Sequence, residues 1–362
     1  MITFEHVEKR YPDGTVAIGD LSFTAATGQL TTLVGPSGCG KTTSLRMINR
    51  LIQPTGGRIL LDGEPTLDMD LITLRRRIGY VIQHVGLFPH RTVADNVATT
   101  ARLAGIGKRA ARTRATELLE RVGLAPELAA RYPWQLSGGQ QQRVGVARAL
   151  AADPDVLLMD EPFSAVDPVV RAQLQQQFLQ LQRELGKTIV MVTHDIDEAL
   201  TMGDRIAVFR TGGDLVRFAP PEELLREPGD RFVADFVGGD RGYRGLGFVH
   251  ARSLTIDDEE ALVVGAERAA GEAGWRPVVD AAGIPLGWSG PGEAGPVLAE
   301  QITVTSTPAR RDDSLRRLLN AGLSAPDGRG IVVDGDGRYA GTVALAEITG
   351  ALVRERGAAE PA

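Results

Sequence analysis

The stretch that decides the fold is residues 30–43, LTTLVGPSGCGKTT, where a short β-branched run precedes the spacing G-x-x-x-x-G-K-T. Glycines in such a loop let backbone N–H groups turn inward around a phosphate, while Lys41 supplies a positive charge and Thr42 a Mg²⁺ ligand. A helix that begins near Lys41 would direct its positive N-terminal end to the same anion. A chance glycine-rich turn is the alternative. The agreement of strand, glycines, Lys-Thr and following helix favours a phosphate-binding loop (P-loop).

The composition is that of an ordinary globular chain. Its 362 residues are 43% hydrophobic and 24% charged, a length that predicts two domains. A net charge of −6 gives no reason to expect a nucleic-acid partner. The apolar runs are far shorter than the roughly 18 residues that span a bilayer, and residues 1–6 lack an export signal, so we expect a cytoplasmic location. The one cysteine, Cys39, lies in the P-loop, which excludes an intrachain disulfide or a cysteine-based metal site.

Strands alternate with helices along the first 240 residues. Strands are predicted over 2–7, 16–25, 58–62, 75–83, 156–159 and 188–192, with a solvated basic face at 75–77. Helices are predicted over 113–122, 141–151 and 170–185, within or after a helical insertion at 106–133. Residues 195–198, Asp-Ile-Asp-Glu, fit a capping box that opens a further helix. The alternation predicts an α/β fold with a parallel, doubly wound sheet, whose ligands bind at the carboxyl ends of strands.

Two acidic residues, Asp160 and Glu161, end the predicted strand at 156–159. Phosphoryl transfer needs positioned phosphates, neutralised charge and an oriented water, so one carboxylate directed to Mg²⁺ and another directed to water are both useful. We assign Asp160 to the metal and Glu161 to the water. An acidic turn stopped by Pro162 is the alternative, which the upstream P-loop disfavours.

A second glycine-containing segment, Leu136-Ser-Gly-Gly-Gln140, precedes the predicted helix at 141–151. Ser137 and the two glycines would expose backbone N–H groups at a helix N-terminus, which makes a second anion cradle. A plain helix N-cap is the alternative. Because one chain needs one cradle for its own phosphates, the second indicates a nucleotide held by another copy.

These motifs together resemble the ATP-binding subunit of an ABC transporter over residues 1 to about 240. The resemblance rests on GPSGCGKT at 35–42, Gln83, LSGGQ at 136–140, VLLMDEP at 156–162, residues 164–167 and His194. It implies a P-loop NTPase domain with a parallel-sheet core, an antiparallel β subdomain and a helical subdomain. In this family two subunits enclose two ATP molecules, each between the P-loop of one copy and the LSGGQ of the other, with Mg²⁺ as cofactor.

The resemblance implies a role for each matching residue. Glu161 would be the general base, Gln83 would contact metal and water, and His194 would contact the γ-phosphate. The implied metal ligands are Thr42, Gln83 and Asp160. The implied ATP-binding residues are Tyr11 against adenine, Gly35, Pro36, Ser37, Gly38, Cys39, Gly40, Lys41, Thr42, Thr43, Ser137, Gly138, Gly139, Gln140 and Asp167. Tyr11 as a strand-end aromatic, His194 as a structural residue and Asp167 as a helix cap remain alternatives.

Within the family, residues 83–90 and 92–97 resemble importers of glycine betaine, choline, carnitine and proline betaine. The implied partners are a second copy, a membrane permease whose coupling helix meets the helical insertion, and an extracellular or periplasmic solute-binding protein. The implied location is the cytoplasmic face of the membrane. Import of another solute, such as an amino acid or polyamine, is the first alternative. A soluble ABC ATPase and an exporter are further ones.

The tail, 241–362, contains two matching segments, Val278-Val-Asp-x-x-Gly-x-x-x-Gly287 and Val332-Val-Asp-x-x-Gly-x-x-x-Gly341, which begin 54 residues apart. Each predicts a hairpin preceded by a helix-like acidic segment, at 257–270 and 312–321. Such a repeat resembles a pair of CBS modules, an α+β domain that in this family senses ionic strength or an adenine-type nucleotide. Two unrelated hairpins are the alternative.

The pattern of this pair is eroded. Ala344 and Glu347 stand where nucleotide-binding modules have Ser or Thr and then Asp, and residues 289–296 replace a closing helix. We therefore expect an ATP-binding domain at 1–240 and, at 241–362, a degenerate tandem CBS-like regulatory domain with a structural or ionic-strength role.

Overall fold

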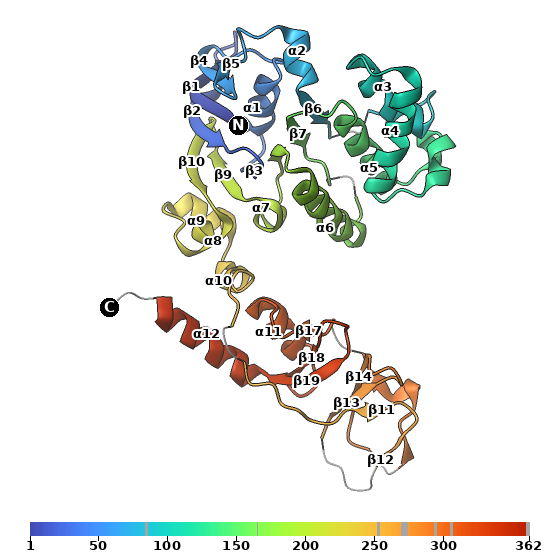
Figure 1. The fold of residues 1–362 in the computed structure, drawn as a ribbon. Helices are drawn as coiled ribbons and strands as arrows, with labels where there is room; N and C mark the ends of the chain where they lie inside the picture. The colour runs from blue at the N-terminus through green and yellow to red at the C-terminus, as the bar shows by residue number, and fades with distance from the viewer. Residues whose placement is uncertain are drawn as a thin grey trace. The chain divides into compact units, whose positions relative to one another are not determined.

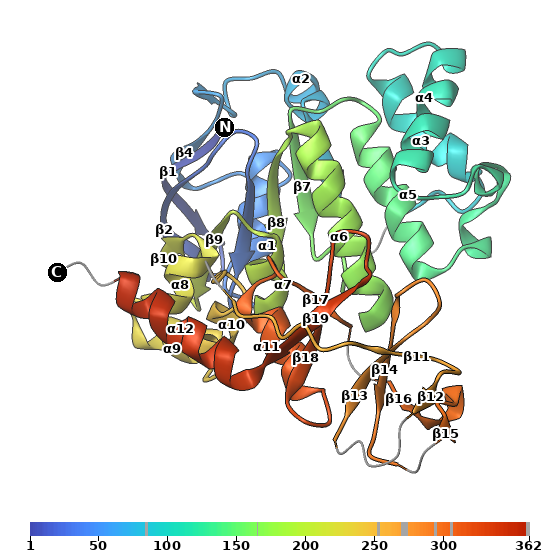
Figure 2. The same cartoon turned by 60° about the horizontal axis from the view of Figure 1, so that its bottom comes forward.

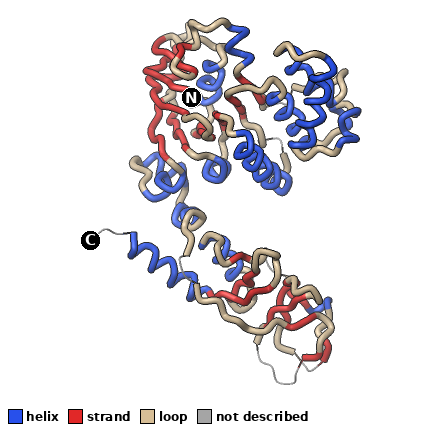
Figure 3. The backbone as a smooth tube through the Cα atoms, in the orientation of Figure 1, coloured by secondary structure: helices blue, strands red, loops and turns tan. Residues whose placement is uncertain are grey.

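The computed structural model describes residues 1–83, 86–164, 166–251, 254–268, 274–292, 295–304 and 307–359. The chain forms two units, Met1–Val237 and Gly238–Ala362, of which the first alternates helices with strands and the second is rich in short strands (Figures 1 and 3). None of the described helices has both the length and the apolar character needed to cross a bilayer.

A six-stranded sheet forms the centre of the first unit, in the order β10-β9-β3-β8-β7-β6. Its strands are β3 (Leu30–Val34), β6 (Ile78–Val81), β7 (Val156–Asp160), β8 (Thr188–Val192), β9 (Arg205–Arg210) and β10 (Asp214–Ala219). All pairs are parallel except β9 with β10. Every residue of β3, β7 and β8 is buried, which explains why these strands are mostly apolar and do not alternate with polar residues. The predicted parallel sheet is confirmed.

An antiparallel sheet in the order β2-β1-β4-β5 packs beside it. Its strands are β1 (Ile2–Arg10), β2 (Val16–Ala25), β4 (Gly56–Leu61) and β5 (Glu64–Pro65). Phe4 and Phe23 stack with ring centroids 4.6 Å apart. Together with the buried face of α1 (Lys41–Ile48), they belong to one apolar core.

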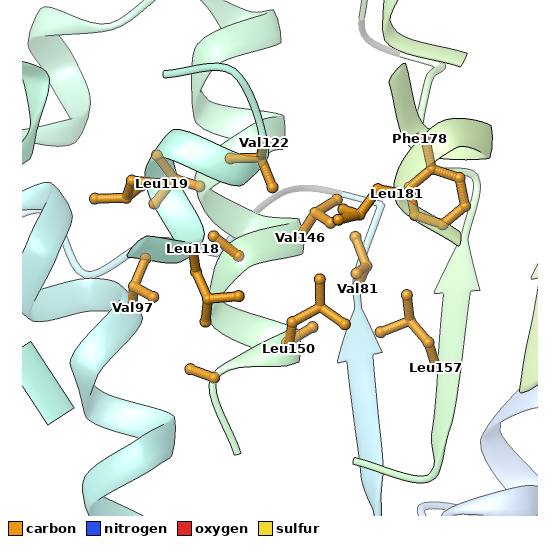
Figure 4. Packing of buried hydrophobic residues seen from close by; sticks show 14 of the residues in the cluster. Val81, Val97, Leu118, Leu119, Val122, Val146, Leu150, Leu157, Phe178 and Leu181 are labelled. Carbon is orange, nitrogen blue, oxygen red and sulfur yellow. The ribbon is translucent and has the colours of Figure 1, made fainter. Parts of the chain in front are cut away.

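The helical layer gathers beside the β6 edge of the central sheet (Figures 1 and 2). It comprises α3 (Val93–Leu103), α4 (Lys108–Arg121), α5 (Gly138–Leu150) and the 3₁₀ turns Pro126–Ala130 and Pro133–Gln135. Figure 4 shows Val97, Leu118 and Val146, from three of these helices, in one apolar cluster with Val81 and Leu157 of the sheet. The layer therefore begins before the predicted position 106.

The remaining helices of this unit follow strands, except α9, which follows α8. They are α2 (Leu71–Arg76), α6 (Pro168–Leu185), α7 (Ile196–Met202), α8 (Pro221–Arg226) and α9 (Arg231–Val237). The predicted stripe of α6 is confirmed at Leu174, Phe178 and Leu181, all buried, whereas Val170 is 38% exposed. Gly186 follows the helix with φ +59°, a conformation that suits a helix end.

The prediction of one strand over 75–83 is wrong. Asp70 caps the first turn of α2 by accepting from the Thr73 N–H, so helix continues to Arg76 and only Ile78–Val81 is strand. The solvated basic face is confirmed at Arg75 and Arg76, which are exposed, whereas Arg77 is only partly exposed. Arg75 donates to backbone carbonyls, and Arg77 forms ion pairs with Asp62 and Asp155.

Two helix starts also differ from prediction. The helix predicted from residue 141 begins at Gly138, because Ser137 caps it and places both glycines inside its first turn. The capping box at 195–198 is half formed. Asp195 accepts from the N–H groups of Asp197 and Glu198, while the Glu198 carboxylate instead accepts from Gln175 Nε2 at 2.9 Å.

The second unit is built around two hairpins. Its helices are α10 (Arg241–Gly245), α11 (Leu315–Leu323) and α12 (Leu345–Ala359), with a 3₁₀ turn at Ala299–Gln301. Its strands are β11 (Leu262–Val263), β12 (Glu267–Arg268), β13 (Arg276–Val279), β14 (Pro285–Ser289), β15 (Gly295–Pro296), β16 (Ile302–Thr303), β17 (Ala309–Arg310), β18 (Arg329–Val333) and β19 (Tyr339–Ala344). The sheet orders are β11-β13-β14-β16 and β17-β18-β19, with β12 paired to β15.

The two predicted hairpins, β13-β14 and β18-β19, share the same bulge position and the same hydrogen bonds in the turn. Val278 pairs with Gly287 before a bulge, and Val332 pairs with Gly341 before a bulge at the same place. In each turn an aspartate carboxylate accepts two backbone N–H groups, Asp280 from residues 282 and 284 and Asp334 from residues 336 and 338. The sequence match therefore reflects a repeated local structure.

The segments before the hairpins are not alike. The helix predicted at 312–321 is confirmed as α11, but the helix predicted at 257–270 is wrong over its described part, 257–268, which holds β11 and β12. Val263 and Val264 favour strand, and Gly265 has φ +85°, which a helix does not accommodate. Residues 269–270 of that prediction lie outside the described residues. So do residues 293–294 of the 289–296 segment.

Candidate active site

The P-loop joins β3 to α1 with a backbone that only glycine accommodates. Gly40, the N-cap of α1, has φ +95°, and a Cβ there would lie 2.5 Å from the Ala17 carbonyl oxygen. At Gly35 a Cβ would lie 2.4 Å from the Phe209 carbonyl oxygen. The glycine spacing of the motif is therefore a requirement of packing as well as of backbone conformation.

Lys41 holds its charge inside the same loop. Its ammonium group is within hydrogen-bond distance of the carbonyl oxygens of Gly35, at 2.7 Å, and Pro36, at 2.9 Å, and lies 3.6 Å from Cys39 Sγ. The side chain is 7% exposed. Phosphate oxygens carry charge and accept more strongly than carbonyls, so the ammonium can exchange these partners for a phosphate within the loop.

Thr42 and Asp160 join the first turn of α1 to the end of β7. The Thr42 hydroxyl donates to Asp160 Oδ1 at 2.9 Å. Burial raises the pKa of Asp160, while the Thr42 hydrogen bond and the Arg46 charge oppose that rise. Hydroxyl and carboxylate oxygens are the hard ligands that Mg²⁺ takes beside phosphates, and the carboxyl ends of strands bring both here.

Glu161 occupies a strained backbone position directly after β7. Its φ is +45°, which is uncommon for a residue with a side chain. Its N–H donates to the Val192 carbonyl at 3.0 Å, and its own carbonyl accepts from the Ser164 hydroxyl at 3.0 Å. These bonds hold the residue in that conformation and fix the direction of its side chain.

Two further predicted residues converge on the Glu161 carboxylate. Gln83 Nε2 donates to Glu161 Oε2 at 2.9 Å, and His194 Nδ1 lies 3.2 Å from the same oxygen. Gln83 follows β6 and His194 follows β8, so three separate strand ends supply the three side chains. An amide, an imidazole and a carboxylate grouped in this way can orient a water beside a phosphate.

These groups line one cavity of about 680 Å³. The lining residues are Tyr11, Thr15, Val16, Ala17, Ser37, Gly38, Cys39, Gly40, Lys41, Thr42, Thr43, Gln83, Glu161 and His194. The Tyr11 ring is 37% exposed at the cavity rim and has Lys9 Nζ 5.2 Å from its centroid. The P-loop, the aromatic residue and the three strand-end side chains are thus brought together as predicted, in a space that suits a nucleotide.

The LSGGQ segment and Asp167 do not line this cavity. Ser137 caps α5 by accepting from the Gln140 N–H, and the Gln140 side chain accepts from the Ser137 N–H, a complete capping box. Ser137 and Gly138 are exposed, and so is Asp167. The second cradle therefore opens at the surface, away from the P-loop cavity of its own chain.

Parts of the predicted motifs cannot be placed. His84 and Val85 of the 83–90 segment and Ala165 of the 164–167 segment lie outside the described residues. In the described part, no cluster of three or more His, Cys, Asp or Glu side chains is arranged to hold a metal ion unaided. The donor set at Thr42 and Asp160 instead suits an ion that arrives with phosphate oxygens, as Mg²⁺ does.

Sequence reasoning missed two neighbours of Asp160. Arg46 Nη2 lies 3.9 Å from Asp160 Oδ2, and Tyr80 lines the same hollow as these two side chains. Neither residue belongs to a motif, and Tyr80 comes 80 residues before Asp160. Pairing of β6 with β7 brings Tyr80 near that carboxylate, which a local pattern does not encode.

Comparison with known proteins places this site in a family. Residues 18–164 match the family model described as "ABC transporter". The chain is 44% identical over 360 residues to the osmoprotectant import ATP-binding protein OsmV of Salmonella typhimurium, which covers 95% of this chain and 94% of that protein. It is 49% identical over 241 residues to the choline transport ATP-binding protein OpuBA of Bacillus subtilis, covering 67% of this chain and 63% of that one.

Two more matches concern the first unit. The chain is 48% identical over 238 residues to the Fe(3+) ions import ATP-binding protein FbpC of Rhizobium etli, covering 66% of each. A dimeric, post-hydrolysis structure of the ATP-binding cassette MJ0796 bound to ADP and Pi has a TM-score of 0.56 at 35% identity, covering 61% of this chain and 99% of that one. With a P-loop cavity of the expected composition and 44% identity along nearly its whole length to one of the family's import proteins, the chain belongs to the ABC transporter family as an ATP-binding subunit.

Proposed function

We propose that this chain hydrolyses ATP to power an importer of quaternary-amine osmoprotectants such as glycine betaine, choline, carnitine and proline betaine. The observation that carries the proposal is the length of the similarity. The ATP-binding unit alone is 49% identical to a choline transport protein and 48% identical to an iron import protein, so it does not distinguish solutes. The match to an osmoprotectant import protein continues through the tail, over 360 residues.

In the proposed mechanism, Lys41 and the loop N–H groups bind the β- and γ-phosphates, and Tyr11 stacks on adenine. Thr42 and Asp160, with Gln83, would hold Mg²⁺, which neutralises charge on the transferring phosphoryl group. Glu161 orients the attacking water and accepts its proton as the water oxygen bonds to the γ-phosphorus, while the bond from that phosphorus to the β,γ-bridging oxygen breaks and ADP leaves. The contacts of Glu161 with Gln83 and His194, at 2.9 and 3.2 Å, support this assignment because they hold the carboxylate at one place.

A second copy completes the site in this proposal. The N-terminus of α5, with Ser137, Gly138, Gly139 and Gln140, would meet the γ-phosphate of the ATP bound in the partner's cavity. Asp167 would connect the two sites. The exposure of Ser137 and its distance from the P-loop cavity of the same chain support a role between copies. The similar MJ0796 cassette, whose structure is dimeric, gives further support.

We further assign a permease and an extracellular or periplasmic solute-binding protein as partners, with the chain held peripherally at the cytoplasmic face of the membrane. Residues 1–240 would form the ATP-binding domain, and residues 241–362 a degenerate CBS-like pair that regulates it. The matching hairpins β13-β14 and β18-β19 support a tandem origin for the tail. The Glu347 carboxylate already accepts from the Thr255 N–H and pairs with Arg354, which argues against its use for a nucleotide ribose.

Import of another solute is the second candidate function, favoured by the 48% identity to the iron import protein. The two are separated by uptake measurements. Vesicles containing the chain with its permease and binding protein should take up labelled glycine betaine or choline when ATP is inside, and the Glu161→Gln chain should abolish that uptake. ATP-driven uptake of ferric iron, an amino acid or a polyamine without betaine uptake would refute the osmoprotectant assignment. Glu5→Gln, on the distant β1 strand, is the control variant.

A further inference from the structure

The two oxygens of the Asp160 carboxylate have separate partners. Oδ1 accepts from the Thr42 hydroxyl at 2.9 Å, and Oδ2 lies 3.9 Å from Arg46 Nη2. Tyr80 lines the same hollow as Arg46 and Asp160, so Thr42, Arg46 and Tyr80 lie around one carboxylate. Asp160 itself is 4% exposed, which leaves little water to satisfy either oxygen.

Arg46 and Tyr80 do not line the P-loop cavity. They line a separate hollow of about 480 Å³ together with Leu51, Ile52, Ile82, Gln83 and Asp160. Arg46 projects from α1 and Tyr80 from β6, whose pairing with β7 sets Tyr80 opposite Leu158. The Tyr80 ring packs against the apolar core, so its hydroxyl is held by the body of the sheet.

A buried carboxylate needs partners at both oxygens to keep one orientation. Residues that contact a metal-binding side chain, but not the metal, fix the rotation of that side chain. Substituting them commonly lowers metal affinity by about 10- to 100-fold. We propose that Arg46 and Tyr80 are positioning residues that fix the Asp160 carboxylate from this hollow, so that Oδ1 stays directed at the Mg²⁺–nucleotide beside Thr42. This inference rests on the proposed ATPase function, because it concerns how one ligand of that site is oriented.

The test is the binding of Mn²⁺, a spectroscopic substitute for Mg²⁺, to the full chain saturated with the non-hydrolysable nucleotide AMP-PNP. Electron paramagnetic resonance reports free Mn²⁺ directly. Tyr80→Phe and Arg46→Ala should each weaken Mn²⁺ binding by about tenfold. The affinity for AMP-PNP in EDTA should stay unchanged, because the phosphate-binding loop is intact. Arg46→Lys, which restores the charge, should recover most of the lost metal affinity.

Leu51→Ala is the matched control, because Leu51 lines the same hollow without contacting the carboxylate. It should bind Mn²⁺ as the unaltered chain does. Tyr80→Phe and Arg46→Ala chains with unaltered Mn²⁺ affinity would overturn the inference, and so would an equal loss in Leu51→Ala. An unaltered chain that bound no AMP-PNP would refute the proposed function, and this inference with it.

Discussion

Glu161 and His194 lie at the ends of neighbouring strands, with Oε2 of the first 3.2 Å from Nδ1 of the second. The Val192 carbonyl, two residues before His194, also accepts the Glu161 N–H at 3.0 Å. The backbone that positions the carboxylate is therefore the same backbone that positions the imidazole. A change in either strand end would be transmitted to both side chains.

The first prediction follows from this pairing. Glu161→Gln should reduce ATP turnover by about 10²- to 10⁴-fold, because an amide cannot accept the proton of the attacking water. ATP binding should persist, since the P-loop is unaltered. Steady-state phosphate release and equilibrium ATP binding measure the two effects, and size-exclusion chromatography with ATP should show a trapped dimer. Turnover near that of the unaltered chain would remove Glu161 from the base role.

Lys41→Ala should act on binding instead of turnover. The ammonium group is held inside the loop by the Gly35 and Pro36 carbonyls, and Lys41 is the one Lys or Arg among the described residues that line the cavity. A hydrogen bond to a charged group contributes about 1.5–3 kcal/mol, so ATP affinity should fall by roughly tenfold to a hundredfold. Isothermal titration calorimetry with ATP gives the value. Arg58→Ala, at a surface ion pair of β4, should leave it unchanged.

Ser137 has two roles that substitution can separate. Its hydroxyl oxygen accepts from the Gln140 N–H, so Ser137→Ala should cost about 1 kcal/mol of stability through loss of the cap. Ser137→Asp keeps a cap but sets a negative charge at the proposed meeting point with the partner's γ-phosphate. We therefore expect the Asp variant to melt like the unaltered chain yet fail to dimerise with ATP in the Glu161→Gln background. Dimerisation by the Asp variant would argue that α5 does not face a phosphate.

Much of this architecture was predictable from local patterns. The errors of prediction also have local causes. Strands β7 and β8 were predicted almost to the residue because each is buried throughout and has four consecutive apolar residues. The strand predicted at 75–83 overlooked Asp70, an N-cap signal that starts α2. The neighbours of Asp160 could not be predicted at all, since Tyr80 comes near it through the pairing of β6 with β7 and Arg46 through the packing of α1 against β7.

Glu198 gives a prediction for pH. It is 6% exposed, and burial raises its pKa above the usual glutamate value, despite hydrogen bonds from Thr193 and Gln175. A raised pKa in the folded state favours the protonated carboxyl, so its contribution to stability is present at low pH and lost as pH rises through the folded pKa. Glu198→Gln keeps a neutral group at all pH values. The urea midpoint of the Glu198→Gln chain should therefore fall less between pH 5 and pH 8 than that of the unaltered chain. The difference between the two falls is the effect of this one titrating group on stability.

The last prediction concerns the tail, in which ion pairs join the segments of the two hairpins. Glu259, from the segment before β11, pairs with Arg276 of β13 at 3.0 Å and with Arg329 of β18, and all three side chains are mostly buried. Deleting residues 241–362 should leave ATP turnover at low salt within about twofold of that of the full chain. The similar MJ0796 cassette, 99% of which matches only 61% of this chain, has a structure without such a tail. The dependence of transport-coupled turnover on salt should change, since partly buried ion pairs respond to ionic strength. Glu259→Gln in the full chain should shift that dependence in the same direction, and an identical salt profile in all three chains would exclude a regulatory tail.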